Sequence, residues 1–120
     1  MKNKNVIVGV TGGIAAYKTA ELVRLLVREG ASTKVAMTAH AKKFITPLTF
    51  EALSGNKVVS DMWDTETNPM DHIKWGQDAD LIVIAPATAN FLAQMAHGVG
   101  SDFLSTLILA ATAKILVCPL

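Results

Sequence analysis

The chain has 120 residues, of which 51% are hydrophobic, so it can form one domain around one core. Eleven Lys and Arg residues against ten Asp and Glu residues give a net charge of +1 without a long basic run, which argues against nucleic acid and anionic membranes as partners. The single cysteine, Cys118, excludes an internal disulfide framework and a multi-cysteine metal site, and it fits a reducing cytoplasm.

The N-terminal apolar run follows two lysines and is similar to the start of a secretory signal peptide. Gly12 and Gly13 interrupt this run, and it continues as an amphipathic helix, so we expect a folded segment rather than a leader. Residues 81–95 are also uncharged, but Pro86 and two amides break them well short of the roughly 20 apolar residues that span a bilayer. We therefore expect a cytoplasmic protein that does not enter the membrane.

Apolar runs alternate with helical patterns along the whole chain. The predicted elements, in chain order, are a strand at 5–10, a helix at 14–29, a strand at 33–38, helices within 39–54, strands at 57–60 and 80–85, helices at 88–97 and 102–112, and a strand at 114–118. Residues 81–85 are apolar at every position, as expected for a central strand covered on both faces. The pattern predicts an α/β fold, a Rossmann-like (flavodoxin-like) three-layer domain with a parallel sheet.

Expected helix ends support this division of the chain. Gly30 fits the position after the first helix, and Gly55 and Gly98 fit the ends of later helices. Ser101 fits the N-cap of the helix at 102–112. We find no internal repeat, low-complexity tract or linker, and we expect a single domain over residues 1–120.

Ligands of open parallel sheets bind at the carboxyl ends of the strands, so the residues after each strand carry the functional information. Thr11–Ile14 follow the first strand, Thr38 follows the second, and Pro86–Asn90 follow the strand at 80–85. These ends offer hydroxyls, amides and open backbone, and none offers a carboxylate. The double glycine passes directly into a helix, an arrangement that leaves backbone N–H groups free to bind an anion, usually a phosphate.

Two nucleotide-binding motifs are absent. The glycines do not have the G-x-G-x-x-G spacing, and Thr38 stands where a dinucleotide site has its acidic residue, so the sequence argues against NAD. No Gly-Lys-Ser/Thr follows the glycines, which excludes a Walker A loop. The pattern instead predicts a phosphate monoester with a flat polar head, held by Gly12, Gly13 and Thr38, with its ring against Thr88 to Asn90. Alternatively, the glycines only permit a tight turn, and Thr88 and Asn90 only cap a helix.

Several linked motifs resemble the flavin-containing cysteine decarboxylases, in order, from about residue 5 to the end. They are TGGIAAYK, MTAHAKKFITPLTFEALSGNKV, the segment 71–80 with its His-Ile and Ala-Asp pairs, APATAN and AHGVGSDFLSTLILAA. The resemblance implies a Rossmann-like domain that binds FMN. It also implies decarboxylation of 4′-phosphopantothenoylcysteine to 4′-phosphopantetheine, a step of coenzyme A biosynthesis, with the cofactor carrying the difficult chemistry.

The resemblance also assigns residues. The cofactor-binding positions that it implies are Gly12, Gly13 and Ile14 at the FMN phosphate, Thr38 after the second strand, and Thr88, Ala89 and Asn90 beside the flavin. His72 matches the catalytic histidine, and an imidazole can take or orient a proton near neutral pH. From the residues alone, an equal alternative to this catalytic role is that His72 caps a short helix. His40 follows the second strand closely enough to approach a phosphate, but we assign neither it nor His97 to the site, and we expect no metal.

The end of the chain departs from the family pattern. Pro119 matches the first residue of a Pro-x-Met-Asn motif, whose Asn holds the substrate carboxylate, but the sequence stops at Leu120, before that Asn and a later flap. We therefore expect a C-terminally truncated core. The resemblance further implies a homo-oligomer, a trimer or an assembly of trimers, with its site at the subunit boundary. A flavin prenyltransferase and a non-catalytic FMN-binding regulatory subunit remain alternatives.

Overall fold

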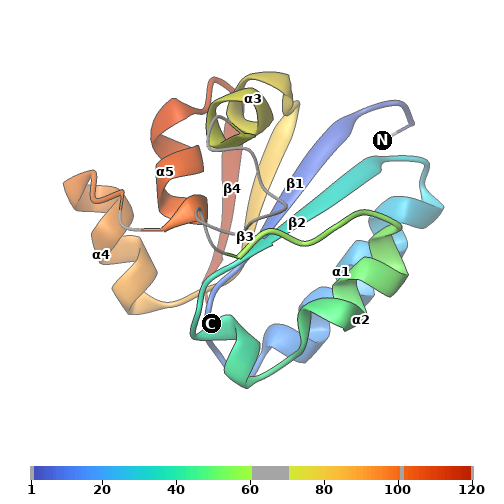
Figure 1. Ribbon diagram of the computed structural model, residues 1–120, viewed down its shortest axis with the longest axis horizontal. Coiled ribbons are helices and arrows are strands. Elements are labelled where there is room, and N and C mark those ends of the chain that lie inside the picture. Colours follow the sequence, from blue (N-terminus) through green and yellow to red (C-terminus); the bar gives the residue numbers. More distant parts are fainter. Residues whose placement is uncertain (1, 61–70, 101, 120) are drawn as a thin grey trace.

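The computed structural model describes residues 2–60, 71–100 and 102–119. The described residues form a four-stranded parallel sheet in the order β2-β1-β3-β4, made of β1 (Asn5–Val10), β2 (Ser32–Met37), β3 (Leu81–Ala87) and β4 (Lys114–Pro119). Helices α1 (Ala16–Arg28) and α2 (Pro47–Ser54) cover one face, and α3 (Asp71–Asp78), α4 (Ala89–His97) and α5 (Phe103–Ala110) lie on the other side (Figure 1). The predicted α/β fold with a parallel sheet is confirmed.

Alternate residues of the strands build two hydrophobic cores. Val6, Val8 and Val10 of β1 belong to the core that contains Val23 of α1 and Phe50 of α2. The intervening positions of the sheet belong to the core under α4 and α5. Strand β3 is buried on both faces, as its continuous apolar run predicts.

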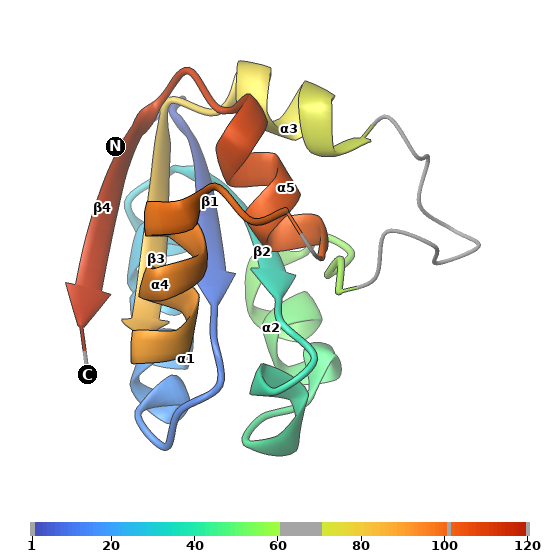
Figure 2. The ribbon, with the colours of Figure 1, turned by 90° about the vertical axis from the view of Figure 1, so that its left-hand side faces the viewer.

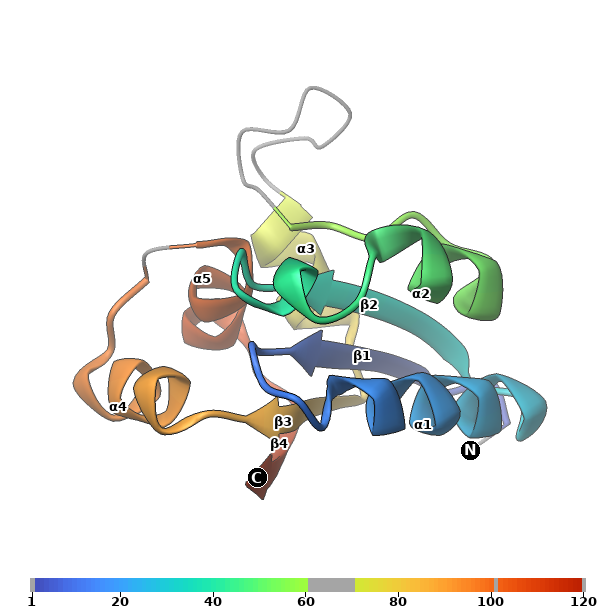
Figure 3. The ribbon, with the colours of Figure 1, turned by 90° about the horizontal axis from the view of Figure 1, so that it is seen from below.

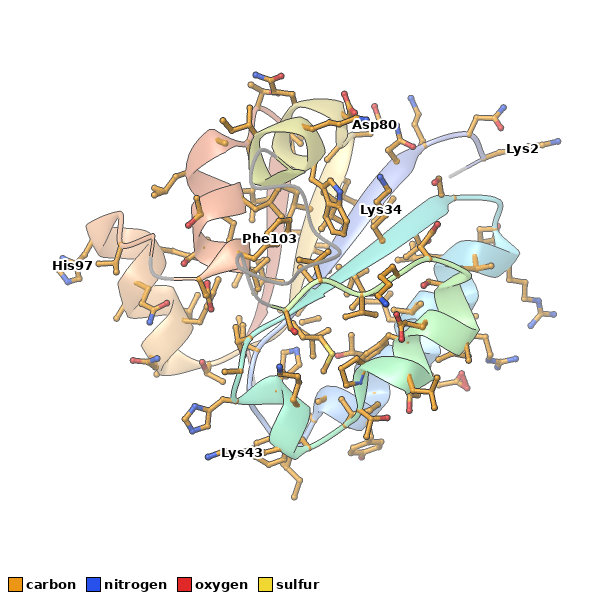
Figure 4. The ribbon with its side chains drawn as sticks, in the orientation of Figure 1. Lys2, Lys34, Lys43, Asp80, His97 and Phe103 are labelled. Carbon is orange, nitrogen blue, oxygen red and sulfur yellow. The ribbon has the colours of Figure 1, made fainter. Side chains whose placement is uncertain are left out.

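Glycine allows α5 to lie close to the sheet. A Cβ placed on Gly9 would lie 2.6 Å from Cδ1 of Leu104, so a larger residue would push α5 away from β1. The T-shaped contact between Trp75 and Phe103, with ring centroids 5.2 Å apart, joins α3 to the same helix. The Phe103 side chain, labelled in Figure 4, is buried.

Glycine also ends the helices where the sequence predicts. Gly30, Gly55 and Gly98 have φ values of 88°, 75° and 66°, the left-handed conformation that glycine adopts without strain. Ser101, the predicted N-cap of α5, lies outside the described residues, and the prediction is wrong because Asp102 is the N-cap. The Asp102 carboxylate accepts a hydrogen bond from the Ser105 N–H at 2.8 Å.

Two other predicted elements differ from the structure. The strand predicted at 57–60 is reduced to an isolated bridge between Val59 and Ala36, because its backbone pairs with β2 only around this residue. The helical region within 39–54 divides into a 3₁₀ turn, Ala41–Lys43, and the helix α2. Pro47 occupies the first turn of α2, where its missing N–H costs no helical hydrogen bond.

The parallel strands end together at one edge of the sheet. Their carboxyl ends point downward in Figure 2, whereas α3 crosses near their amino ends at the top. Figure 3 shows the turns after β1 and β2 and the start of α4 on the same side of the molecule. No helix within the described ranges is long and apolar enough to cross a membrane.

Candidate ligand site at the carboxyl ends of the strands

A cavity of about 320 Å³ lies where β1, β2 and β3 end. It occupies the position at which open parallel sheets bind ligands. The lining residues come from the loops after these three strands and from α4 and the start of α5: Thr11, Gly12, Thr38, Ala39, His40, Thr88, Asn90, Phe91, Gln94 and Asp102. The lining includes hydroxyls, amides and glycine backbone, as the strand ends predict.

Thr11 holds two of these loops together. Its buried hydroxyl donates a hydrogen bond to the carbonyl of Pro86 and accepts one from the backbone N–H of Thr88 at 3.0 Å. Both partners lie at the end of β3, so this one side chain fixes the loop after β3 to the end of β1. We did not assign this role from the sequence, because a threonine beside a glycine turn carries no signal for a contact so distant in the chain.

Gly12 brings the turn after β1 against the turn after β2. A Cβ on Gly12 would lie 2.5 Å from Cβ of His40 and 3.0 Å from its carbonyl carbon. The N–H of Thr38 donates to the carbonyl of Val10 at 3.0 Å, and the Thr38 hydroxyl accepts from the N–H of Ala41 at 3.2 Å. Glycine is therefore needed for the close approach of the two turns, and the same residue lines the cavity.

Thr88 and Asn90 lie at the start of α4. The Thr88 hydroxyl accepts a hydrogen bond from the Phe91 N–H at 3.2 Å and is the N-cap of this helix. The capping role that we considered from the sequence is thus confirmed for Thr88, but not for Asn90, which lies inside the helix. Both residues also line the cavity, so the cap and the candidate site share the same loop.

The structure brings together part of the predicted set. Gly12, Thr38, Thr88 and Asn90 line the cavity. Three predicted residues are not among the lining side chains: Gly13, Ile14 and Ala89. The carbonyl of Gly13 accepts a hydrogen bond from Ala16 at 3.0 Å and starts α1, while the side chain of Ile14 is 80% exposed. A contact of their backbone N–H groups with a ligand stays a prediction.

His72 lies in the first turn of α3, and its side chain lies outside the described part of the structure. Helix α3 crosses near the amino ends of the strands (Figure 2), whereas the cavity lies at their carboxyl ends. None of the described α3 side chains, from residue 73 to 78, lines the cavity. Within one chain, therefore, α3 and the cavity lie at opposite ends of the sheet.

Sequence reasoning missed three polar residues of the lining. His40, to which we assigned no role, borders the cavity from the turn after β2. Gln94 follows Asn90 by four residues and so lies on the same face of α4, a spacing that the sequence offers as a signal. Asp102 supplies a carboxylate that we did not expect, because we inspected only the residues that follow strands. The capping pair with Ser105 is the signal that marks it.

Two other candidates lie away from this cavity. His97 is exposed in the last turn of α4, next to the left-handed Gly98, and points away from the molecule in Figure 4. Cys118 is half-buried in β4 against the core under α1. Neither residue lines the cavity.

The fold and the cavity define a three-layer α/β protein with a candidate ligand site at the carboxyl ends of its sheet. The sequence matches the Flavoprotein family over residues 1–120. The chain therefore belongs to the Flavoprotein family, and the resemblance found from its motifs is confirmed.

Three relatives illustrate the similarity. The coenzyme A biosynthesis bifunctional protein CoaBC of Vibrio cholerae is 48% identical over 120 residues, which are 99% of this chain and 30% of that protein. The structure of SpaF, an FMN-dependent cysteine decarboxylase, is 33% identical with a TM-score of 0.88, covering 97% of this chain and 67% of SpaF. A PPC decarboxylase variant complexed with pantothenoylaminoethenethiol is 26% identical with a TM-score of 0.79, over 98% of this chain and 67% of that one.

The match to the CoaBC proteins is partial in length. The chain spans about 30% of the curated relatives that it matches, so it corresponds to one part of those bifunctional proteins.

Proposed function

We propose that this chain binds FMN and decarboxylates 4′-phosphopantothenoylcysteine to 4′-phosphopantetheine, a carboxy-lyase step of coenzyme A biosynthesis. The observation that carries the proposal is the cavity at the carboxyl ends of β1, β2 and β3, whose lining includes Gly12, Thr38, Thr88 and Asn90. The names of the similar proteins, which include an FMN-dependent cysteine decarboxylase and a PPC decarboxylase, support the same function.

The residues of the cavity fit FMN better than a dinucleotide. Helix α1 starts directly after the Gly12–Gly13 turn, so the positive end of its dipole lies at this turn and favours a phosphate there. The Thr38 hydroxyl already accepts a hydrogen bond from Ala41, and its proton is free to donate to a phosphate oxygen. No acidic side chain follows β2 to hold the ribose of a dinucleotide.

At the other side of the cavity, Thr88, Ala89 and Asn90 begin α4 and would lie against the flavin ring. The hydrogen bond from Thr88 to Thr11 holds this loop in place before a ligand binds. Loss of CO2 leaves a carbanion that needs an electron sink, and none of the amino-acid side chains can act as one. FMN would supply this sink when bound. The role of the chain is to bind and orient FMN and the substrate, and to move protons.

His72 is the residue that we propose for proton transfer. Histidine is the side chain best suited to take and return a proton near neutral pH. Because α3 and the cavity lie at opposite ends of the sheet, we propose that His72 acts at the cavity of a neighbouring copy of the chain.

An apolar surface near the cavity supports association between copies. Four large apolar side chains are exposed at the start of α1 and in the segment from the 3₁₀ turn to α2: Ile14 at 80%, Tyr17 at 63%, Phe44 at 51% and Leu48 at 72%. Apolar side chains gathered in this way are typical of surfaces that are covered by another protein. We propose a homo-oligomer, a trimer or an assembly of trimers, of single-domain subunits.

The free cysteine, Cys118, fits a cytoplasmic location, which is also where we propose that the protein acts. The experiment that tests the function is an assay of CO2 release from phosphopantothenoylcysteine by purified protein with FMN and by the same protein stripped of it. We expect release only with FMN. Bound FMN without CO2 release from this substrate would contradict the decarboxylase function.

A further inference from the structure

Asp102 contributes the one carboxylate among the described residues that line the cavity. It is the N-cap residue of α5 and lines the same cavity as Gly12 of the turn after β1. Its carboxylate is half-buried and is held in a fixed position by the capping box at the start of that helix. A side chain with this much constraint presents the same atoms to every ligand that enters.

The two oxygens of this carboxylate have different surroundings. Oδ1 accepts hydrogen bonds from the Ser105 N–H at 2.8 Å and from the Ser105 hydroxyl at 2.6 Å. No described residue donates a hydrogen bond to Oδ2. The helix cap therefore uses Oδ1, and the residue that carries both oxygens lines the cavity. A partly buried carboxylate oxygen is stabilised by any N–H or O–H donor that approaches it.

The Asp102 carboxylate also makes one side of the cavity electrostatically different from the other. It repels the phosphate of a bound nucleotide, whereas the start of α1 attracts it. FMN therefore has one favourable direction, with its phosphate at the Gly12 turn and a hydrogen-bond donor at Asp102. FMN carries two kinds of donor away from its phosphate, the ribityl hydroxyls and the imide N–H of the ring.

We propose that Oδ2 of Asp102 accepts a hydrogen bond from an O–H or N–H donor of bound FMN and thereby fixes the direction in which the nucleotide lies. Asp102 is then a specificity residue of the cofactor site. The inference rests on the proposed function, because it needs FMN in this cavity.

Asp102→Asn tests the inference with little change to the fold. Asparagine caps helices as well as aspartate does, and its amide oxygen can replace Oδ1 opposite Ser105. Its NH2 group replaces Oδ2 and meets the donor of the ligand with another donor. A hydrogen bond to a charged group is worth enough that we expect the FMN dissociation constant to rise about 10- to 100-fold. Quenching of flavin fluorescence measures it, and thermal unfolding of the apoprotein reports the fold.

Two control variants separate the contact from its alternatives. Asp78→Asn removes the same charge at the opposite end of the sheet, near Asn5, and we expect it to leave FMN affinity unchanged. Ser105→Ala keeps the carboxylate but removes a hydroxyl that bonds to it, so we expect lower stability with nearly unchanged FMN affinity. Weakening by Ser105→Ala as large as that by Asp102→Asn would assign the effect to the helix cap and overturn the inference.

The reduction potential of the bound flavin identifies the donor. A carboxylate beside the ring disfavours electron uptake, so a higher potential in Asp102→Asn assigns the donor to the ring N–H, and an unchanged potential assigns it to a ribityl hydroxyl. Equal FMN affinity of the wild type and Asp102→Asn would overturn the inference and leave the proposed function standing. Absence of FMN binding by the wild type would instead remove the proposed function, and this inference with it.

Discussion

The hydroxyl of Thr11 accepts a hydrogen bond from the backbone N–H of Thr88 at 3.0 Å, although the two residues are 77 positions apart in the sequence. The same hydroxyl donates to the carbonyl of Pro86. Through these two bonds, the end of β1 determines where the loop after β3 lies and hence where α4 begins. The shape of the cavity depends on this pairing, because both residues line it.

Replacement of Thr11 by valine keeps the side-chain volume and removes the hydroxyl. It leaves the Pro86 carbonyl and the Thr88 N–H without their partner, and we expect a loss of about 1–3 kcal/mol in the free energy of unfolding. The displaced loop should also weaken FMN binding. Urea denaturation and an FMN titration measure the two effects.

The matched control is Thr33→Val. Thr33 is equally buried, but its hydroxyl donates only to the nearby carbonyl of Ala31 at 3.3 Å, near the amino ends of the strands. This variant should retain full FMN affinity. A Thr11→Val protein that binds FMN as tightly as the Thr33→Val protein would argue against the role of Thr11 in the cavity.

Replacement of Gly12 by alanine should open the cavity. The new Cβ would lie 2.5 Å from Cβ of His40, a distance that forces the turns after β1 and β2 apart. We expect about 1–3 kcal/mol of destabilisation, typical of overpacking, and loss of measurable FMN binding. Thermal unfolding and flavin fluorescence report these changes.

Gly55→Ala provides the comparison for this substitution. Gly55 has φ of 75° and no atom within 4 Å of its added Cβ, so alanine adds backbone strain at the end of α2 without a clash. It should lower the unfolding temperature and leave FMN affinity unchanged. Equal loss of FMN binding by Gly12→Ala and Gly55→Ala would contradict the proposed role of the glycine turn.

His72→Asn should separate binding from turnover. Removal of a proton-transfer group lowers the rate of catalysis by about 100- to 10,000-fold, and the account expects FMN to bind as in the wild type. CO2 release from phosphopantothenoylcysteine and FMN affinity are the two readouts. His97→Asn changes an exposed histidine at the end of α4 and should retain full activity. Undiminished CO2 release by His72→Asn would exclude the catalytic role.

A shared site between copies predicts complementation. His72→Asn alone and Gly12→Ala alone should both be inactive, the first without its proton-transfer group and the second without FMN. When the two chains are co-expressed in equal amounts, a site made from two copies receives both intact parts in about a quarter of cases, and activity returns to that extent. Different affinity tags on the two chains, used one after the other in purification, isolate the mixed oligomers. Mixed oligomers without any activity would indicate that each site is built from one chain.

Much of the fold was predictable because its causes are local. Strand β3 is apolar at every position and α1 follows a double glycine, so both elements have strong signals in the sequence. The segment around Val59 has β-branched residues but pairs with β2 through a single bridge, and propensity alone does not limit the length of a pairing. The requirement for glycine at position 9 is also non-local, because a side chain there would clash with Leu104 of α5.

The candidate site was predicted only where a strand end marks it. Thr38 and Thr88 follow strands and were found for that reason. Asp102 follows a loop and precedes a helix, so its place in the lining depends on how α5 packs beside α4. The position of α3 at the opposite end of the sheet from the cavity depends on how all the strands assemble. No sequence pattern around His72 predicts this position.

The most direct test of the account is titration of the purified apoprotein with FMN and, separately, with riboflavin. We expect one FMN per chain, held by its phosphate at the Gly12 turn, and riboflavin bound at least about 10-fold more weakly because it lacks the phosphate. Equal binding of the two flavins would contradict the phosphate site, and no binding of either would contradict the assignment of this cavity to a flavin.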